Sequence, residues 1–557
     1  IDGSVGYGLN NAGTVDNSGM IKVGQITGTG LEGMFNASGS TFNNKPRASV
    51  QIDRTSSSGD QAFYTAGIVN NEGTIAIGSM AAVAKIGLKV GGGTFNNKPG
   101  GSVQIDGTGS HALQVLNSGT VLNNEDLIEI GSNSGISGTG IRNENGSTLN
   151  NKVGGTIRIN RVGIYNTNVL GGIRNSGVFN NDANITIGDG VLLYAQDGIF
   201  NLGSGNFRNN AEGVISIQKP WGNGIWNSSG TFQNAGKITI SNIFYFEDGN
   251  FSTGILSTAP FTNSSGAEIH IDQVANGIAS TNAFTNAGLI RMGENGPLTG
   301  SGIANIQGAA AVFNNNAGGD ISIKQTAVDG LQNDLNSTFN NNACATLTLF
   351  DNLNNSGTFT NSGLFTVNTT QTHTNTALTN NGTIAYPQGN PIPNVTNNEI
   401  TIAPVTSNDC GPVSPAFGLG SPVDFTILGI FSDQAATMLA GTYVTATNTF
   451  TPSPVLAIGT YTLYVKIEDA NGGCTRVLPW ELTVEDNIAP EFDCTTLLDI
   501  TANTDAGQCY ATLNVTAPQA IDNCSGTITA TGVRDDNAAL TATYPVGTTT
   551  ITWTFTD

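Results

Sequence analysis

The sequence predicts an all-β protein in which a parallel β-solenoid is followed by two small β-sandwich domains. Three observations lead to this fold class. A degenerate repeat of about 26 residues runs through the first two thirds of the chain. Short apolar alternations with a period of two residues recur within each repeat, which indicates strands rather than helices. Beyond residue 400 the repeat stops and acidic residues become denser.

Each repeat is marked by one apolar anchor residue that Asn-rich polar residues follow, often after Gly-Thr. The segment Gly93–Asp106 nearly repeats the segment Ser40–Asp53. The spacing of the anchors predicts about 15 turns of about 26 residues each within residues 1–390. The anchors are Val15, Phe42, Val69, Phe95, Leu122, Leu149, Phe179, Phe207, Phe232, Phe261, Phe284, Phe313, Phe339, Phe359 and Leu378.

An apolar-x-apolar triplet follows every anchor, from Ile21–Val23 to Ile384–Tyr386, and a third apolar patch often comes after it. Three short strands in each repeat, with no helical periodicity, are typical of one turn of a parallel β-solenoid. A single turn cannot bury its apolar face, so stacked turns must share one core. The sequence therefore predicts an interior of Ile, Val and Phe and ladders of Asn side chains bonded along the axis.

The distance from each anchor to its triplet alternates between six and eight residues in the first twelve repeats. The longer form carries inserts such as Lys45-Pro46 and Lys98-Pro99. We therefore expect a two-turn module, in which one corner is tight in one turn and two residues longer in the next.

The composition excludes several classes of protein. Gly makes up 73 of 557 residues without a three-residue period, so the chain is not collagen. No apolar run is long enough for a transmembrane helix. The net charge of −21 argues against nucleic acid as a partner. No signal peptide opens the chain, so we expect a processed chain or a piece of a longer one.

The rest of the chain is predicted to hold a linker and the two β domains. The segment 391–398 is rich in Pro and Asn and lies where the repeat ends, and residues 401–557 carry 16 acidic and three basic residues. Residues 399–484 contain short apolar alternations separated by turn residues, which is typical of a β-sandwich. The second domain is expected to span residues 485–557.

Four motifs in residues 485–557 resemble those of the HYR (hyalin repeat) family. They are Glu485–Cys494, Asp505–Cys509, Ala517–Cys524 and Tyr544–Thr550. That family is an extracellular immunoglobulin-like module, common in large surface proteins of Bacteroidota. The sequence departs from the family at Thr495, where the family usually has Pro, and it lacks the family's last strand with a fourth Cys. The resemblance implies two tandem immunoglobulin-like domains, the last one incomplete, in a protein that continues beyond Asp557.

The repeats resemble, more loosely, the β-helical shafts of filamentous bacterial adhesins and autotransporter passengers. Those shafts share turns of the form Gly-Thr-x-x-Asn-x-Gly-x-Ile-x-Ile. Both resemblances imply an extracellular protein of the cell surface. The resemblance to Bacteroidota proteins also implies export by the type IX system.

Six Cys residues, most of them in small β modules, indicate an oxidising compartment. We expect Cys410 to pair with Cys474, since they lie near the two ends of the first β domain, and Cys494 to pair with Cys524. Cys509 is expected to pair with the family's fourth Cys, and Cys344 is expected to be a lone buried thiol. No C-x-x-C motif occurs and no His lies near a Cys in the sequence, so zinc is not expected.

A concentration of aromatic residues in three successive turns forms the first candidate site. Trp221 follows Pro220 in a Gly-rich loop, where an exposed ring would be a stacking platform for a sugar. The alternative is that these rings stack in the interior or anchor loops. The residues are Tyr194, Trp221, Trp226, Phe244, Tyr245 and Phe246.

Calcium is the candidate metal, and no other cofactor is expected. Oxygen-rich junctions between β modules bind calcium, which stiffens the chain of modules. The alternative is that these groups are surface charge that keeps the protein soluble. The residues near the expected domain boundary are Glu468, Asp469, Glu485, Asp486 and Asn487.

An enzyme is not expected, although many polysaccharide lyases and glycosidases are β-helical. Such a site needs carboxylates at close range. The outward column at the centre of the triplets has one carboxylate, Glu129, among fifteen residues, and Asp53, Asp106 and Asp272 share another position but lie at least two turns apart. The segment Gly28–Gly33 fits G-x-G-x-x-G, but no helix is expected after it, so a dinucleotide site is not expected.

The sequence therefore predicts an adhesin or filament segment on a bacterial surface, in which the solenoid projects and the β domains form a stalk. The expected partners are surface glycans or other cell-surface ligands, together with further copies or domains of a longer chain. Two alternatives stay open. One is a pure spacer or fibre component without a ligand, and the other is a β-helical polysaccharide lyase or glycosidase.

Overall fold

The computed structural model describes residues 1–55, 61–83, 85–163, 171–188, 197–243, 252–306, 308, 310–397, 401–407, 410–418, 425–469 and 474–557. These residues form strands, turns and two short 3₁₀ helices, η1 (Thr445–Thr447) and η2 (Cys494–Thr496), and they include no α-helix. The chain divides into two compact units, Ile1–Asn398 and Glu399–Asp557.

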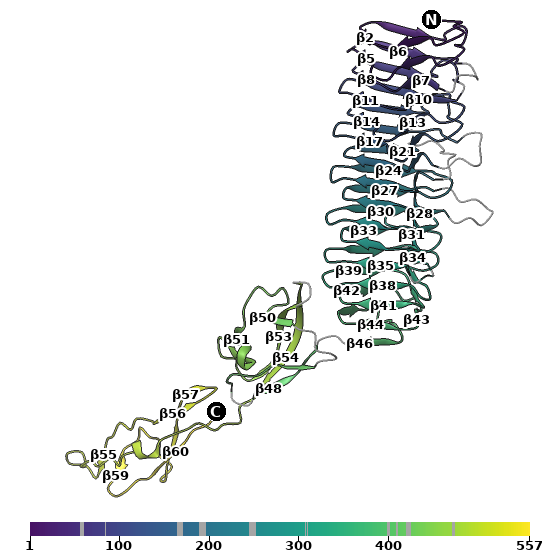
Figure 1. The fold of residues 1–557 in the computed structure, drawn as a ribbon. Coiled ribbons are helices and arrows are strands. Elements are labelled where there is room, and N and C mark those ends of the chain that lie inside the picture. Colours follow the sequence, from purple (N-terminus) through teal and green to yellow (C-terminus); the bar gives the residue numbers. More distant parts are fainter. Residues whose placement is uncertain are drawn as a thin grey trace. The chain divides into compact units, whose positions relative to one another are not determined.

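The unit Ile1–Asn398 is a parallel β-solenoid, as predicted, in which three sheets run along one axis (Figure 1). We call them sheets A, B and C, and they hold 15, 16 and 15 strands. Sheet A consists of β1 (Leu9–Asn11), β4 (Met34–Asn36), β7 (Gln61–Thr65), β10 (Ile86–Val90), β13 (Leu113–Val115), β16 (Ile141–Asn143), β19 (Ile173–Asn175), β22 (Ile199–Asn201), β25 (Ile225–Asn227), β28 (Thr253–Ser257), β31 (Asn276–Ser280), β34 (Ile303–Asn305), β37 (Leu331–Asn333), β40 (Leu353–Asn355) and β43 (Thr374–Asn375).

Sheets B and C contain the strands that the anchors and the triplets predict. Sheet B consists of β2 (Thr14–Asn17), β5 (Thr41–Asn44), β8 (Ile68–Asn71), β11 (Thr94–Asn97), β14 (Val121–Asn124), β17 (Thr148–Asn151), β20 (Val178–Asn181), β23 (Asn206–Asn209), β26 (Thr231–Asn234), β29 (Phe261–Asn263), β32 (Phe284–Asn286), β35 (Val312–Asn315), β38 (Thr338–Asn341), β41 (Thr358–Asn361), β44 (Leu378–Asn380) and β46 (Val395–Asn397). Sheet C consists of β3 (Met20–Val23), β6 (Ser49–Ile52), β9 (Thr74–Ile77), β12 (Ser102–Ile105), β15 (Leu127–Ile130), β18 (Thr156–Ile159), β21 (Asn184–Ile187), β24 (Val214–Gln218), β27 (Lys237–Ser241), β30 (Glu268–Asp272), β33 (Leu289–Met292), β36 (Asp320–Ile323), β39 (Thr346–Leu349), β42 (Leu364–Val367) and β45 (Thr383–Ala385).

The anchors line the interior of sheet B in strict register. Phe207 on β23, for example, lies directly opposite Phe232 on β26, and both side chains are fully buried. From Phe179 to Phe339 the anchor rings stack on one another with centroid separations of 4.6–5.1 Å. This spacing follows from the distance between paired strands, about 4.8 Å, so each turn adds one ring to a continuous column.

One inner column of Asn side chains runs through the whole of sheet B. Each amide nitrogen donates to the amide oxygen of the next turn at 2.7–2.8 Å, which confirms the predicted ladder. The members are Asn17, Asn44, Asn71, Asn97, Asn124, Asn151, Asn181, Asn209, Asn234, Asn263, Asn286, Asn315, Asn341, Asn361, Asn380 and Asn397.

A second Asn column lies on the outer face of sheet B and runs in the opposite sense. There Asn70 donates to Asn43 at 2.9 Å, and Asn150 donates to Asn123 at 2.9 Å, so the later turn gives its amide hydrogen to the earlier one. Beyond Asn180 this column continues with Arg208, which interrupts the ladder of amides, and an amide bond of the same sense forms again where Asn340 donates to Asn314 at 2.9 Å.

The corner between sheets B and C alternates as predicted. Two residues join β8 to β9, four join β11 to β12, and two join β14 to β15. In the longer corner Gly101 donates its backbone N–H to the carbonyl oxygen of Lys98 at 2.8 Å, and Gly100 has a φ of +87°. The two-turn module is therefore a feature of the structure and not drift in loop length.

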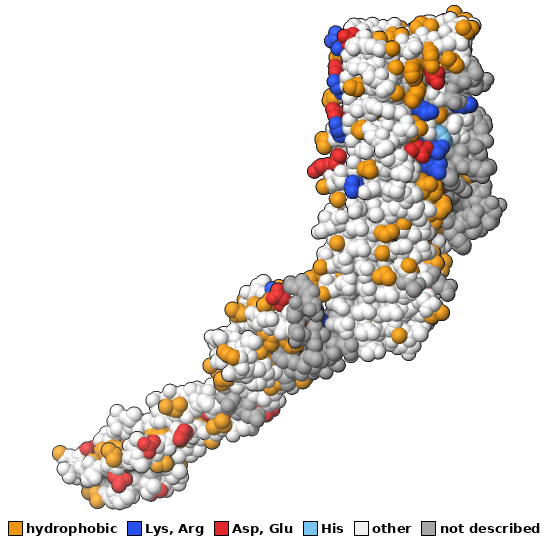
Figure 2. Space-filling view, in the orientation of Figure 1, with side chains coloured by type: hydrophobic (Ala, Val, Ile, Leu, Met, Phe, Trp, Pro, Cys, Tyr) orange, Lys and Arg blue, Asp and Glu red, His pale blue; other side chains and the backbone are white. Residues whose placement is uncertain are grey.

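The alternation brings opposite charges together along this corner. Lys98, which begins a longer corner, forms an ion pair with Glu72 of the tight corner before it at 3.2 Å. Lys152 and Glu125 repeat the arrangement at 2.7 Å. Figure 2 shows these alternating basic and acidic side chains along one edge of the solenoid.

The corner that enters sheet A depends on glycine. Gly224 lies directly before β25, and a Cβ at this position would be 2.6 Å from the carbonyl oxygen of Gly254 and 2.6 Å from Cγ2 of Ile240. Real Cβ atoms do not approach other atoms so closely. The next turn and the core therefore both require the absence of a side chain here, and Gly198 and Gly277 lie in equivalent contacts.

The predicted linker 391–398 is wrong in part, because the solenoid extends into it. Val395–Asn397 forms β46, which pairs with β44, and Ile392 is buried in the solenoid core. The reason is that Asn397 still continues the inner Asn ladder, by accepting from Asn380 at 2.8 Å. This turn is shorter and lacks the Gly-Thr signal of the others, so the repeat pattern missed it.

The unit Glu399–Asp557 begins with a four-stranded sheet. Its strands are β48 (Val405–Ser407), β54 (Thr475–Val484), β53 (Gly459–Asp469) and β50 (Phe425–Phe431), in that spatial order. Two further pairs are β47 (Thr401–Ala403) with β49 (Ala416–Gly418), and β51 (Gly441–Val444) with β52 (Thr449–Pro452). Trp480 is fully buried in the core and packs edge-on against Phe450 at 5.7 Å.

Residues 485–557 form three pairs of short antiparallel strands. The pairs are β55 (Tyr510–Ala511) with β59 (Tyr544–Pro545), β56 (Gln519–Asp522) with β57 (Gly526–Thr529), and β58 (Thr531–Arg534) with β60 (Ile551–Thr554). The buried Arg534 organises this region, since its guanidinium lies 3.9 Å from the centre of the Tyr544 ring and pairs with Asp536 at 2.6 Å. The immunoglobulin-like topology of the two domains stays a prediction.

The cysteine pairing differs from the expectation. Cys410 is bonded to Cys524, so neither the predicted Cys410–Cys474 pair nor the predicted Cys494–Cys524 pair is present. Cys494 and Cys509 are exposed free thiols. The pairing of Cys410 depends on how the chain segments of this unit pack together, which spacing along the sequence does not encode.

Two other cysteines are also disulfide-bonded, Cys344 and Cys474. The prediction of a lone buried thiol at Cys344 is therefore wrong. Cys344 lies at the third position of a four-residue corner with a φ of +61°, and its side chain is exposed. A corner residue faces outward because the strands on either side of it supply the core.

Candidate functional site

The outer face of sheet A carries the most varied side chains of the solenoid. Its central column contains Phe35, Tyr64, Lys89, Gln114, Arg142, Arg174, Phe200, Trp226 and Leu256, each one turn from the next. In the outer column of sheet C, by contrast, short polar residues dominate over much of its length. Sheet A is therefore the face on which a ligand would find aromatic and cationic groups together.

Three aromatic rings lie at the first turns of this face, two of them in the column and one, Tyr7, before β1. The ring of Tyr7 stacks on Phe35 at 5.1 Å, and Phe35 lies 5.4 Å from Tyr64. The Nζ of Lys89 lies 5.4 Å from the centre of the Tyr64 ring. All four side chains are partly exposed. The sequence alone did not reveal this row, because its members are spaced by whole turns and belong to the least regular strand of the repeat.

The predicted aromatic site is described only in part. Trp226 lies on β25 and packs against Phe200 at 4.6 Å, so one face of its ring is covered by its neighbour in the column. Trp221 is 36% exposed and lies in the loop before β25. The remaining candidates lie outside the described residues: Tyr194, Phe244, Tyr245 and Phe246.

A charged cluster follows the aromatic row and was also missed by the sequence analysis. Arg142 forms an ion pair with Glu144, and its guanidinium lies 3.0 Å from Nε2 of His111. Gln114 donates to the same carboxylate of Glu144 at 3.3 Å. Figure 2 shows a histidine among basic and acidic side chains on this surface. Arg174 lies one turn beyond Arg142, so two guanidinium groups share the field of one carboxylate.

The cluster keeps its histidine neutral. Burial, and next the charge of Arg142, lower the pKa of His111 to about 4. Burial, and next the charge of Arg142, also lower the pKa of Arg174. The cationic character of this face near neutral pH therefore comes from its arginines and from Lys89, and not from His111.

A buried carboxylate lies at the entrance to β22. Asp197 accepts hydrogen bonds from the backbone N–H of Asn223 at 3.0 Å and from its side-chain amide at 2.8 Å, both at Oδ1. Its other oxygen, Oδ2, is buried and has no hydrogen-bond partner among the described residues. Burial raises the pKa of Asp197 to about 6. The group holds the loop of the next turn in place at the cost of a charge in the interior.

The carboxylates that an enzyme would need do not gather on sheet C. The register of its central column places Glu129 between Gln104 and Arg158, with no second carboxylate in an adjacent turn. Asp53 and Asp106 are buried and organise the loops after sheet C. Asp106, for example, accepts the backbone N–H of Asn133 at 3.0 Å.

The G-x-G-x-x-G segment has a packing role. Cβ atoms at Gly28 and Gly30 would lie 2.2 Å from the carbonyl oxygen of Arg54 and 2.3 Å from that of Val5. The glycines therefore let neighbouring turns approach each other. These residues border a hollow of about 570 Å³ at the first turns.

The residues expected to bind calcium do not come together as a group. Glu485 and Asn487 are exposed, and Glu468 lies on β53 opposite Thr475 of β54. Asp469 ends β53, and its side chain lies outside the described part of the structure. Among the described residues, none of these four joins a cluster of metal-ligand side chains.

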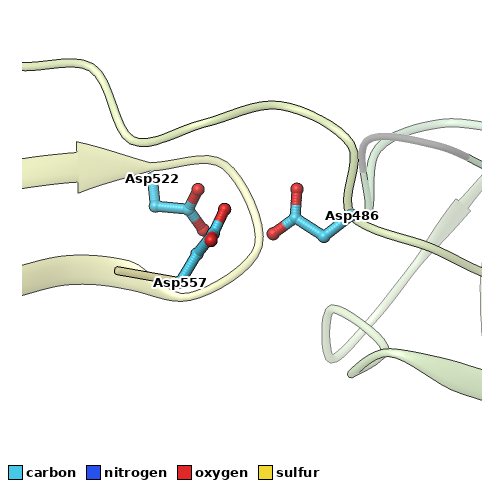
Figure 3. Close-up of side chains that lie close together, drawn as sticks. All are labelled: Asp486, Asp522 and Asp557. Carbon is cyan, nitrogen blue, oxygen red and sulfur yellow. The ribbon is translucent and has the colours of Figure 1, made fainter. Parts of the chain in front are cut away.

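Asp486, alone among the predicted calcium ligands, lies close to two other carboxylates. These two carboxylates were not among the predicted ligands. Asp486, Asp522 and Asp557 have carboxylate oxygens that lie within 4.8 Å of one another. Figure 3 shows the three side chains pointing toward one another from three separate stretches of chain. No signal in the sequence places these stretches side by side, because none of them belongs to the repeat.

The comparisons with known proteins add no relative. No family model, no curated protein and no solved structure matches the chain. Within the described residues, no helix has the length and apolar character needed to cross a membrane.

Proposed function

We propose that the chain is a segment of an extracellular bacterial surface adhesin or filament. In this proposal the solenoid is a stiff projecting rod, the β domains form a stalk, and the outer face of sheet A makes adhesive contacts. The observation that carries the proposal is the unbroken Asn ladder from Asn17 to Asn397, which joins every turn to the next beside a continuous core. Such a rod on the order of 70 Å long suits reach rather than catalysis.

Two further observations support the extracellular assignment. The disulfide between Cys410 and Cys524 needs an oxidising compartment to form. The resemblance of residues 485–557 to the HYR family points to surface proteins of Bacteroidota and to type IX export. We propose no enzymatic activity for the described residues.

The proposed ligand is a surface glycan with acidic groups. Guanidinium groups at Arg142 and Arg174 suit carboxylates or sulfates, and the partly exposed ring of Trp221 suits the apolar face of a sugar. The rings of Phe200 and Trp226 contribute less, because they pack against each other and so cover part of their faces. The whole chain has a net charge of −21, so a stretch with several cationic side chains differs clearly from the rest of the protein.

A glycan array probed with the full 557-residue chain tests this proposal. The array holds neutral, sulfated and uronic-acid glycans. We expect binding to acidic glycans that falls at least tenfold in Arg174→Gln and in Trp221→Ala. Arg158→Gln, an exposed arginine on sheet C with the same change of charge, is the control and should bind like the wild type. Binding to no glycan at all would leave the spacer as the better proposal.

A further inference from the structure

Three separate stretches of chain meet beside Asp486 in the unit Glu399–Asp557. The backbone N–H of Glu491 donates to the carbonyl oxygen of Ile521 at 2.9 Å, and the N–H of Ile521 donates back at 3.1 Å. The rings of Phe492 and Phe555 pack with centroids 4.9 Å apart. The first contact brings the stretch after β54 to β56, and the second brings it to the stretch after β60. The carboxylates of Asp486, Asp522 and Asp557 are therefore positioned by the fold around them.

Two oxygens in this group are buried and have no hydrogen-bond partner in the described part of the chain. Asp522 is only 4% exposed, and its Oδ1 accepts the backbone N–H of Cys524 at 2.9 Å and that of Ser525. Its Oδ2 has no partner among the described residues, and Figure 3 shows the carboxylate of Asp522 directed toward the other two. Oδ2 of Asp486 is likewise buried without a partner, while its Oδ1 accepts the N–H of Ile488 at 3.2 Å.

Within the part of the chain that the structure describes, no basic side chain neutralises the group. Among the described residues, no lysine, arginine or histidine forms an ion pair with any of the three carboxylates. Carboxylates at this distance repel one another, and the repulsion is stronger where one of them is buried. A buried charge without a partner is also costly. A cation held between the three groups removes both costs.

We propose that Asp486, Asp522 and Asp557 bind one divalent cation, and that this cation is calcium. The ligands are all carboxylate oxygens, which hard cations prefer, and no thiolate or imidazole belongs to the group. Two oxygens that bind one calcium ion at about 2.4 Å lie no more than about 4.8 Å apart. Each of the three carboxylates has an oxygen within this distance of the other two. Ligands from three loosely structured stretches suit the flexible coordination of calcium better than the strict octahedron of magnesium.

The site lies next to the disulfide of this unit. Cys524 donates its backbone N–H to Asp522. Its sulfur forms the disulfide with Cys410, which lies 114 residues earlier in the chain. A bound cation would thus fix the same turn that the disulfide fixes, and it would tie the stretch after β54 to β56. We expect calcium to reduce the opening of residues 486–492 and 519–525. This inference is independent of glycan binding.

Calorimetry and hydrogen exchange on the full chain test the inference. The chelator-treated protein is titrated with CaCl₂ and, separately, with MgCl₂, and backbone exchange is measured with and without calcium. We expect one calcium ion to bind and to slow exchange in residues 486–492 and 519–525. Asp522→Asn and Asp486→Asn should weaken calcium binding at least tenfold. Asp499→Asn, an exposed carboxylate with the same change of charge, should bind like the wild type.

Several outcomes would overturn the inference. One is a wild-type chain that shows neither a heat of calcium binding nor calcium-dependent protection of these residues. Another is equal calcium binding by Asp522→Asn and the wild type. Equal affinity for magnesium would overturn the assignment to calcium. If Asp522→Asn fails to fold, Asp486→Asn decides, because Asp486 is less buried than Asp522 and its carboxylate accepts one backbone N–H where that of Asp522 accepts two.

Discussion

The side-chain amide of Asn151 donates a hydrogen bond to Oδ1 of Asn181 at 2.7 Å, one turn further along the solenoid. Its second amide hydrogen goes to the backbone carbonyl of Asn184 at 3.1 Å. Its own Oδ1 accepts from Asn124 at 2.8 Å. A single buried side chain thus connects three successive turns and closes a corner. This explains why the inner column contains Asn in every turn.

We expect Asn151→Leu to destabilise the solenoid by about 2–6 kcal/mol, because one amide hydrogen of Asn124 and Oδ1 of Asn181 stay buried and lose the hydrogen bonds that Asn151 supplies. Thermal unfolding and hydrogen exchange of the adjacent turns measure the loss. The neighbouring Asn150 belongs to the outer column, where Thr262 occurs at another turn. Asn150→Thr is the matched control and should cost less than about 1 kcal/mol. Equal effects of the two substitutions would contradict a special role for the inner ladder.

Gly224→Ala should destabilise the solenoid by about 1–3 kcal/mol, because its new methyl group would overlap the backbone of the next turn and a core side chain. Melting temperature measures the effect. Gly13→Ala is the control, since nothing lies within 4 Å of a Cβ at Gly13. That variant should be neutral or gain up to about 1 kcal/mol from the lower entropy of its unfolded chain. A neutral Gly224→Ala would mean that the corner can relax.

Asp197 should make the solenoid more stable in mild acid than at neutral pH. Burial raises its pKa to about 6 in the folded chain, above the ordinary 3.8, so the folded state binds the extra proton. Its contribution to stability is present below pH 4 and is lost as the pH rises from about 4 to about 6. Asp197→Asn should therefore raise the stability at pH 7.5 by on the order of 3 kcal/mol and leave it nearly unchanged at pH 4.

Unfolding of wild type and Asp197→Asn at several pH values checks this prediction. Asn retains an oxygen that accepts the two bonds from Asn223, so the substitution tests charge rather than hydrogen bonding. A difference between the two proteins that does not change with pH would show that Asp197 is not the titrating group.

Peptide mapping without reduction should recover a link between Cys410 and Cys524, with Cys494 and Cys509 open to alkylation. Replacing both Cys410 and Cys524 by Ser should lower the stability of the unit Glu399–Asp557 by about 2–4 kcal/mol, because the bond closes a long loop of chain. Recovery of a Cys494–Cys524 peptide would instead favour the pairing first expected for this region.

The periodic part of the fold was predictable, and the irregular part was not. The repeat alone identifies Phe207 as a core residue and Asn209 as a ladder residue, because stacking turns in register leaves no other arrangement. The repeat did not predict strand β46, because the turn that contains it is shorter than the others. The pairing of Cys410 with Cys524 and the meeting of Asp486 with Asp522 depend on contacts between segments that share no repeat.

The aromatic and charged groups of sheet A were missed for another reason. Tyr64 and Arg142 are separated by many residues, yet both fall in one column once the register is known. Alignment of the third apolar patch of every repeat would have revealed this column. The third apolar patch is the most variable part of the repeat, because the insertions of the repeat lie in the loop before it.

The inner Asn ladder makes the two ends of the solenoid chemically different. Every amide in it donates towards the C-terminal turn, as Asn209 does to Asn234 at 2.8 Å, so a finished turn displays a donor at a fixed place for the turn that is synthesised next. Growth of the rod is then templated, like the addition of a layer to a crystal face. A strand that arrived one residue out of step would turn its apolar anchor out of the core and point its ladder Asn away from that donor, so each turn selects the register of its successor.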